Sequence, residues 1–172
     1  MGQRLVVGVD GSPSSYTALR WAVEYAGRTG ARVRAVRCWM PVFKVRGWEA
    51  AVTGEPVSPA EQGARARREL ADIVAAALLW VSDKATRIVV DQKLVRGPAG
   101  PMLVANADGA DLLVVGHGPR VAELLHRSVS WYCVRNATCP VLVIPPAMAT
   151  CRTLTAVTGA APARVLPVPA RR

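Results

Sequence analysis

Short aliphatic runs alternate with segments of helical periodicity along most of this chain, and this alternation constrains its fold more than any other feature. The runs lie at residues 5–9, 33–39, 88–95, 111–115 and 139–144. Their lengths suit strands, and four helical patterns separate them. Such alternation predicts a parallel sheet wrapped by right-handed crossovers. We therefore expect an α/β fold with a doubly wound, five-stranded parallel sheet and helices on both faces.

Two of the predicted helices carry clear start signals. Ser12 can accept a hydrogen bond from a first-turn amide, Pro13 suits the first helical position, and Gly30 ends the pattern. Ser58 is followed three residues later by Glu61, which is the spacing of a capping box. The helix predicted there carries an apolar stripe at Leu70, Ile73, Val74, Ala77, Leu78 and Val81.

The length of 172 residues fits one domain with a substantial core. We expect this domain to cover residues 1–146, with a loop or flap at 40–57. Residues 147–172 are rich in Ala, Pro, Thr and Arg and lack a period, so we expect a disordered tail.

The formal net charge of +10 raises the question of nucleic-acid binding. Four of the positive charges are arginines after Pro146, and the others are scattered over several segments. No basic motif with interleaved aromatic residues occurs, so we expect no dedicated nucleic-acid site. Nonspecific attraction to anions is the alternative.

Membrane and disulfide signals are weak. The first aliphatic stretch is too short for a signal peptide, and residues 73–82, an uncharged apolar run, are about half of the roughly 20 residues that span a bilayer. We therefore expect a soluble cytoplasmic protein. Reduced, mostly buried thiols are expected because no Cys-x-x-Cys spacing occurs among Cys38, Cys133, Cys139 and Cys151.

Ligand crevices of doubly wound sheets lie at the carboxyl ends of strands where the winding reverses, here the first and fourth strands. Asp10 follows the first strand, where it can bind a ribose or a metal, or simply complement a helix dipole. Gly116 and Gly118 follow the fourth strand and offer exposed amides to a phosphate. Ser128 and Ser130 can support the same phosphate, or only cap a helix.

Catalytic signals are missing from the sequence. No Gly-x-Ser-x-Gly elbow occurs, and the chain has only two histidines. We interpret His117 as a surface or structural residue, or a ligand contact, rather than a general base. We therefore predict a protein that is not an enzyme.

Five segments in order resemble the successive signatures of the universal stress protein family: VVGVDGSP (6–13), ALRWA (18–22), ADLLVVG (110–116), SVS (128–130) and CPVLVI (139–144). The resemblance spans residues 4–146. It implies strand order 3-2-1-4-5, the adenine-nucleotide alpha-hydrolase-like arrangement, and homodimerisation through the last strand. In one subgroup it also implies ATP, with Mg²⁺, between strands one and four.

The loop that marks this ATP-binding subgroup is altered here. The family pattern is Gly-x-x-Gly, nine residues, then Gly-Ser/Thr, whereas this chain has Gly116-x-Gly118, eight residues, then Arg127 before Ser128. An arginine cannot replace a glycine that needs positive φ or close approach to a phosphate. Arg127 nevertheless adds a cation that can rebuild an anion site.

Carried over position by position, the resemblance places the ribose or metal at Asp10 and the base at the backbone near Cys38. It also places Arg37, where relatives often have His, at the edge of the pocket. The candidate binding residues are Val9, Asp10, Gly11, Cys38, Gly116, His117, Gly118, Arg127, Ser128, Val129 and Ser130.

Two functions remain open at this point. The first is an ATP-binding regulatory domain that acts in stress response through dimerisation and partner binding. The second is a nucleotide-independent dimeric interaction module that retains the fold with a degenerate loop. A phospho-receiver is disfavoured, because Pro145-Pro146 follows the fifth strand where a lysine would be needed.

Overall fold

The computed structural model of the chain describes residues 2–41, 58–80, 88–118 and 128–145. The predicted loop at 42–57, Val81, Arg127 and the predicted tail at 147–172 lie outside these ranges. Described elements alternate as the sequence predicts: β1 (Arg4–Gly8), α1 (Pro13–Thr29), β2 (Arg32–Trp39), α3 (Pro59–Trp80), β3 (Val90–Arg96), α4 (Ala99–Asn106), β4 (Leu112–Gly116), α5 (Val129–Asn136) and β5 (Val141–Ile144).

The strands form one sheet in the order β3-β2-β1-β4-β5, and every pairing is parallel. Val6 of β1 lies between Arg34 of β2 and Leu113 of β4 in the register. The chain winds outward from β1 in both directions, so the winding reverses between β1 and β4. The predicted fold class and strand order are confirmed.

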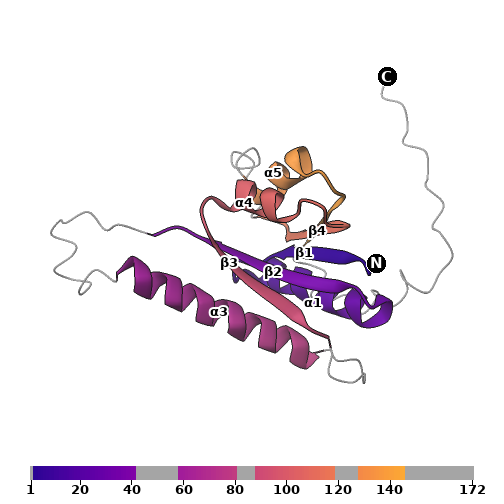
Figure 1. Ribbon diagram of the computed structural model, residues 1–172, viewed down its shortest axis with the longest axis horizontal. Coiled ribbons are helices and arrows are strands. Elements are labelled where there is room, and N and C mark those ends of the chain that lie inside the picture. The colour runs from indigo at the N-terminus through magenta and orange to yellow at the C-terminus, as the bar shows by residue number, and fades with distance from the viewer. Residues whose placement is uncertain (1, 42–57, 81–87, 119–127, 146–172) are drawn as a thin grey trace.

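Helices cover both faces of the sheet, with α1 and α3 on one side and α4 and α5 on the other (Figure 1). Two apolar cores result. The core beneath α1 and α3 includes Leu19, Leu70 and Val114, and the core beneath α4 and α5 includes Leu103 and Cys133. Burial of an aliphatic side chain of this size contributes about 1.5–3 kcal/mol, so both layers stabilise the sheet.

The predicted helix signals have the expected geometry. The Ser12 hydroxyl accepts a hydrogen bond from the Ser15 amide at 3.2 Å, and Gly30 ends α1 in the left-handed conformation. At α3, the Ser58 amide donates to the Glu61 carboxylate at 2.8 Å and the Glu61 amide donates to the Ser58 hydroxyl at 3.2 Å. The apolar stripe is confirmed within the described residues: Leu70, Val74 and Ala77 are buried, and Ile73 and Leu78 pack against the same core.

Each of the five strands differs from its predicted bounds by one or two residues at one end or both. β3 begins at Val90 rather than 88, because its pairing with β2 begins at Val90 opposite Val33. Ile88 packs against the core from outside the strand. Helix α4 begins at Ala99, since Pro98 already accepts the first helical hydrogen bond, from the amide of Met102.

Candidate functional site

A cavity of about 570 Å³ opens at the carboxyl ends of β1 and β4, the point where the winding reverses. This is where doubly wound sheets hold their ligands. Three helices begin at its rim, since residues at the starts of α1, α4 and α5 all line it. The lining residues are Gly8, Val9, Asp10, Ser12, Pro13, Ser14, Ser15, Val36, Cys38, Ala99, Leu103, Val115, Gly116, His117, Gly118, Ser128, Val129 and Ser130.

Apolar side chains form much of the cavity surface. Val36 and Cys38 reach it from β2, because alternate side chains of a strand point to the same face. Val9, Leu103 and Val115, all buried, join them from the end of β1, from α4 and from β4. Such a surface suits a flat, uncharged ring system.

The polar groups of the cavity belong to two helix starts. We call Asp10, Ser12, Ser14 and Ser15 the α1 wall, and residues 128–130 the α5 wall. Backbone amides at a helix start carry partial positive charge and attract anions. The cavity therefore combines an apolar surface with two sets of polar groups.

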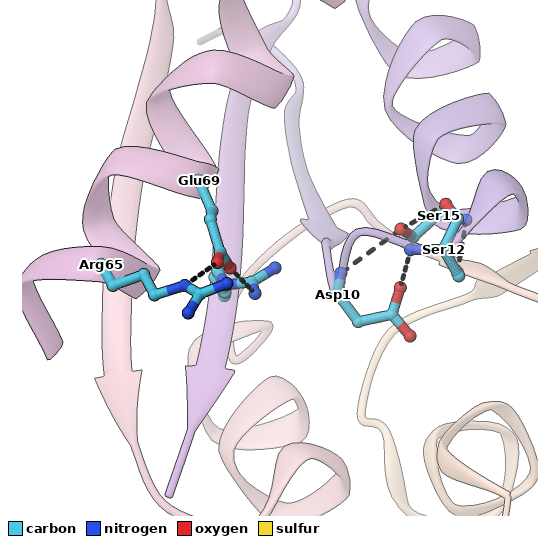
Figure 2. Close-up of polar contacts among 6 residues, drawn as sticks. Asp10, Ser12, Ser15, Arg65 and Glu69 are labelled. Carbon is cyan, nitrogen blue, oxygen red and sulfur yellow. Dashed lines mark hydrogen bonds and ion pairs between the residues drawn. The ribbon is translucent and has the colours of Figure 1, made fainter. Parts of the chain in front are cut away.

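The α1 wall is tied together by its own hydrogen bonds. The Asp10 carboxylate accepts a hydrogen bond from the Ser12 amide at 2.8 Å, and the Asp10 amide donates to the Ser15 hydroxyl at 3.3 Å (Figure 2). The Ser15 hydroxyl in turn donates to the Ser12 carbonyl at 3.0 Å. Ser14 links the turn to the residue that follows β4 by donating to the His117 carbonyl at 3.0 Å.

The Asp10 carboxyl is ionised at neutral pH. Desolvation raises its pKa, but hydrogen bonds from the side chains and backbone of this turn, chiefly from Ser12, outweigh that effect and lower the pKa below 3.8. The free carboxylate oxygen can accept hydrogen bonds from a sugar hydroxyl. It can also contribute to a cation site.

Gly116 is required by packing. A Cβ on this residue would lie 2.7 Å from backbone atoms of both Ser14 and Ser15, closer than real contacts allow. Gly118 has more room, because a Cβ there would meet the Ser128 Cβ at 3.5 Å, an ordinary contact. Neither glycine has a positive φ. The close approach of β4 to α1 therefore explains Gly116 without any ligand.

The α5 wall begins the last helix. The Ser128 hydroxyl accepts a hydrogen bond from the Trp131 amide at 3.1 Å, so Ser128 is the helix cap predicted from the sequence. It also lies 3.3 Å from the Ser130 hydroxyl. Both hydroxyls line the cavity, so capping and ligand binding are compatible here.

Cys38 is a partly buried thiol within the cavity, and its Sγ donates to the Ala99 carbonyl at 3.9 Å. Burial raises the pKa of Cys38, and it raises the pKa of Cys133, on the buried face of α5, to about 11. These thiols and Cys139 are free, as expected. They are protonated at neutral pH, which favours a packing role.

Nine of the eleven predicted binding residues line this cavity. Gly11 does not; it lies behind the α1 wall with φ at 89°. Arg127 lies outside the described residues. The placement of Arg37 at the pocket edge is wrong, because Arg37 points to the α3 face of the sheet, opposite to its neighbours Val36 and Cys38.

Sequence reasoning missed several lining residues. The period of two along β2 could have found Val36 from Cys38, and the same period along β1 could have found Gly8. Helical spacing did not indicate that α4 would reach the cavity, since this depends on how α4 packs across β2. The lining residues missed as binding candidates are Gly8, Ser12, Pro13, Ser14, Ser15, Val36, Ala99, Leu103 and Val115.

The described part of the chain has neither a metal-binding cluster nor a membrane-spanning helix. No group of three or more His, Cys, Asp or Glu side chains there is arranged to hold a metal ion. None of the described helices has the length and apolar character needed to cross a membrane.

Residues 1–145 match the model of the universal stress protein family, so this chain belongs to that family. A universal stress protein of Mycobacterium tuberculosis is 33% identical over 153 residues, a match that covers 82% of this chain and 47% of the relative. A second, from Mycolicibacterium smegmatis, is 30% identical over 83% of this chain and 45% of its own length. The chain thus spans about half the length of these curated relatives.

Solved structures share the fold. A universal stress protein in complex with cAMP superposes with a TM-score of 0.57 at 26% identity, covering 84% of this chain and 97% of that one. A universal stress protein family member from Arabidopsis thaliana with AMP bound gives a TM-score of 0.55 at 18% identity, covering 83% and 91%. The latter likeness shows the fold alone.

Proposed function

We propose that this chain is a nucleotide-binding regulatory domain that takes an adenine nucleotide in the cavity between β1 and β4. The single observation that carries the proposal is the composition of that cavity: an apolar surface beside an ionised carboxylate and two helix starts. The 26% identical neighbour in complex with cAMP supports the same class of ligand.

The three parts of a nucleotide match three parts of the cavity. The base lies against the apolar surface near Cys38 and Val36, a ribose hydroxyl donates to the Asp10 carboxylate, and phosphate oxygens accept from the α5 wall. Asp10 repels phosphate because it is ionised, so the phosphate lies toward Ser128 and Ser130. In this orientation the negative carboxylate faces a hydroxyl donor, and the negative phosphate faces the amides and hydroxyls of a helix start.

ATP with Mg²⁺ is our proposed physiological form. Among the described lining residues, Asp10 is the only carboxylate. Mg²⁺ bound with nucleotides usually takes one or two carboxylates, together with phosphate oxygens and water, so one carboxylate fits this role. Asp10 would be the protein ligand of the ion, and the ion would supply positive charge that offsets the charge of the phosphates.

Dimerisation through β5 is the second part of the proposal. β5 is an edge strand of the sheet, and an unpaired edge can pair with another chain. Helix α5, which precedes it, exposes apolar side chains: Trp131 is 44% exposed and Val134 is 50% exposed. We propose that a second copy covers this edge, in a cytoplasmic protein that acts in stress response through partner binding.

The alternative function, a dimeric interaction module without nucleotide, is favoured by the same exposed surface of α5. The two functions differ only in whether the cavity binds a nucleotide. A chain of this kind would keep the dimer and bind no nucleotide.

Calorimetry with AMP, and with ATP and Mg²⁺, tests whether the chain binds nucleotide. The mass of the protein in solution tests whether it forms a dimer. We expect a Kd below about 1 mM, which corresponds to about 4 kcal/mol of binding free energy. A dimer that binds neither ligand at that level would establish the interaction module instead. A monomer that binds nucleotide would overturn only the dimer.

A further inference from the structure

A network of three charged side chains lies on the α3 face of the sheet, on the side away from the cavity. Arg37 of β2 pairs with Glu69 of α3, with 2.5 Å between its Nη2 and the carboxylate Oε2. Arg65 reaches the same carboxylate from one turn earlier in α3, at 2.9 Å (Figure 2). The Arg65 side chain is 78% exposed, whereas that of Arg37 is 15% exposed. Arg37 is therefore the inner member of the network.

Two nitrogens of the Arg37 guanidinium take no part in that network. Nε and Nη1 are buried and have no hydrogen-bond partner among the described residues. Removing guanidinium nitrogens from water without a partner costs free energy, so a buried arginine of this kind calls for an explanation. Packing of the core does not supply one, because an aliphatic side chain would fill the same space without this cost.

The Arg37 guanidinium faces Gly11 in the turn that carries Asp10. Its Nη1 would be 3.6 Å from a Cβ placed on Gly11, the residue between Asp10 and Ser12. Gly11 has a φ of 89°, a conformation that residues with side chains rarely adopt. The turn is thus bounded by the cavity on one side and by Arg37 on the other.

We propose that Arg37, anchored by Glu69, is a positioning residue for Asp10: it supports the Gly11 turn from behind the sheet and so directs the carboxylate toward the ribose of the nucleotide. The inference rests on the proposed nucleotide function. Arg37 acts through contact with the turn and not through a hydrogen bond to the ligand. Its effect is therefore confined to the part of the ligand that Asp10 recognises.

Two ligands separate this role from general support of the fold. AMP carries the ribose hydroxyls that Asp10 recognises, and 2′,3′-dideoxy-AMP lacks them. In Arg37→Met, which keeps the length of the side chain but cannot pair with Glu69, the Gly11 turn loses its anchored support. We therefore expect AMP to bind roughly tenfold more weakly, the loss of one hydrogen bond to a charged group. The dideoxy ligand should change by less than about twofold. An equal loss for both ligands would overturn the proposal.

A double-mutant cycle with Asp10→Ala gives an independent test. If Arg37 acts through Asp10, the double variant Arg37→Met/Asp10→Ala binds AMP as weakly as Asp10→Ala alone. Losses that add would show that Arg37 affects binding by another route, which would contradict the proposal. Arg65→Met is the matched control: it removes the outer partner of Glu69 and should leave the affinity for both ligands within about twofold of wild type.

A loss of binding through unfolding is distinguished from a loss of the positioning role by a second measurement and a second variant. Circular dichroism establishes whether Arg37→Met is folded; if it is not, Glu69→Gln, which releases the anchor and keeps Arg37, is measured with both ligands. We expect it to lose AMP selectively, and equal losses would again overturn the role. If the wild-type protein binds neither ligand, the nucleotide function itself fails, and the positioning role with it.

Discussion

The two polar walls of the cavity are built in different ways. The α1 wall is closed by hydrogen bonds among residues within one turn, and Gly116 packs tightly against its backbone. The α5 wall has a single cap at Ser128, and it begins a helix of only eight residues whose outer surface is apolar and exposed. The α1 wall is therefore formed by the fold itself, whereas the α5 wall is the one to which our proposal assigns both the phosphate and the surface for a partner.

The largest effect that tests this contrast is expected from Gly116→Ala. The new Cβ would lie 2.7 Å from the Ser14 and Ser15 backbone, so either β4 or α1 must move. We expect the free energy of unfolding to fall by about 1–3 kcal/mol, as for overpacked cores. Urea denaturation measures it.

Gly118→Ala provides the matched control for that measurement. Its Cβ would meet Ser128 at an ordinary distance of 3.5 Å, and the residue has no positive φ. The unfolding free energy should change by less than about 0.5 kcal/mol. Equal destabilisation by the two variants would contradict the view that only the α1 wall is tightly packed.

A second prediction assigns a different part of the nucleotide to each wall. Asp10→Ala should weaken AMP and adenosine alike, about tenfold, because both ligands carry the ribose. Ser128→Ala should weaken AMP by about the same factor and leave adenosine unchanged, since adenosine has no phosphate. Calorimetry with the two ligands measures both effects.

Cys133→Ala is the control for binding, because Cys133 lies on the buried face of α5 and does not line the cavity. Its affinity for AMP should equal that of wild type. If Ser128→Ala weakened adenosine as much as AMP, the phosphate would not lie at the α5 wall. The assignment of the two walls would then be wrong.

The smallest expected effect is a pH dependence of stability that comes from Asp10. Because hydrogen bonds lower its pKa in the folded state, Asp10 stabilises the fold at any pH above its ordinary value of 3.8. This contribution is lost as the pH falls from 3.8 through the lower pKa of the folded state. The unfolding free energy of wild type should exceed that of Asp10→Asn at pH 7, and the two should converge below pH 3.8. A difference that grew with acidity would contradict the lowered pKa.

Local signals in the sequence predicted most of the fold. Ser12, Pro13 and Gly30 act through hydrogen bonds and φ angles within a few residues, so the bounds of α1 could be read directly. The strand order came from resemblance to the family, since pairing between distant strands leaves little trace in one sequence. The start of β3 was less certain because its partner in β2 decides it.

The residues of the candidate site also fall into those with a local sequence signal and those placed only by tertiary packing. Asp10 and Ser128 were identified because each follows a turn signal at the start of a helix. Leu103 and Ala99 were missed because only the packing of α4 brings them to the cavity. Arg37 was misplaced although alternation along β2 puts it on the face opposite Cys38, so the error lay in relying on the family position instead of the strand period.

The packing of Gly116 affects how nucleotide-binding chains can be recognised from sequence. Because it has no side chain, it allows the close approach of β4 to α1. A descendant that had lost its ligand would still be selected to keep this glycine, so its presence in a sequence carries no information about binding. Position 118, where a methyl group fits, is free to vary with the ligand. Position 118 is therefore the better diagnostic marker for separating nucleotide binders from chains that kept only the scaffold.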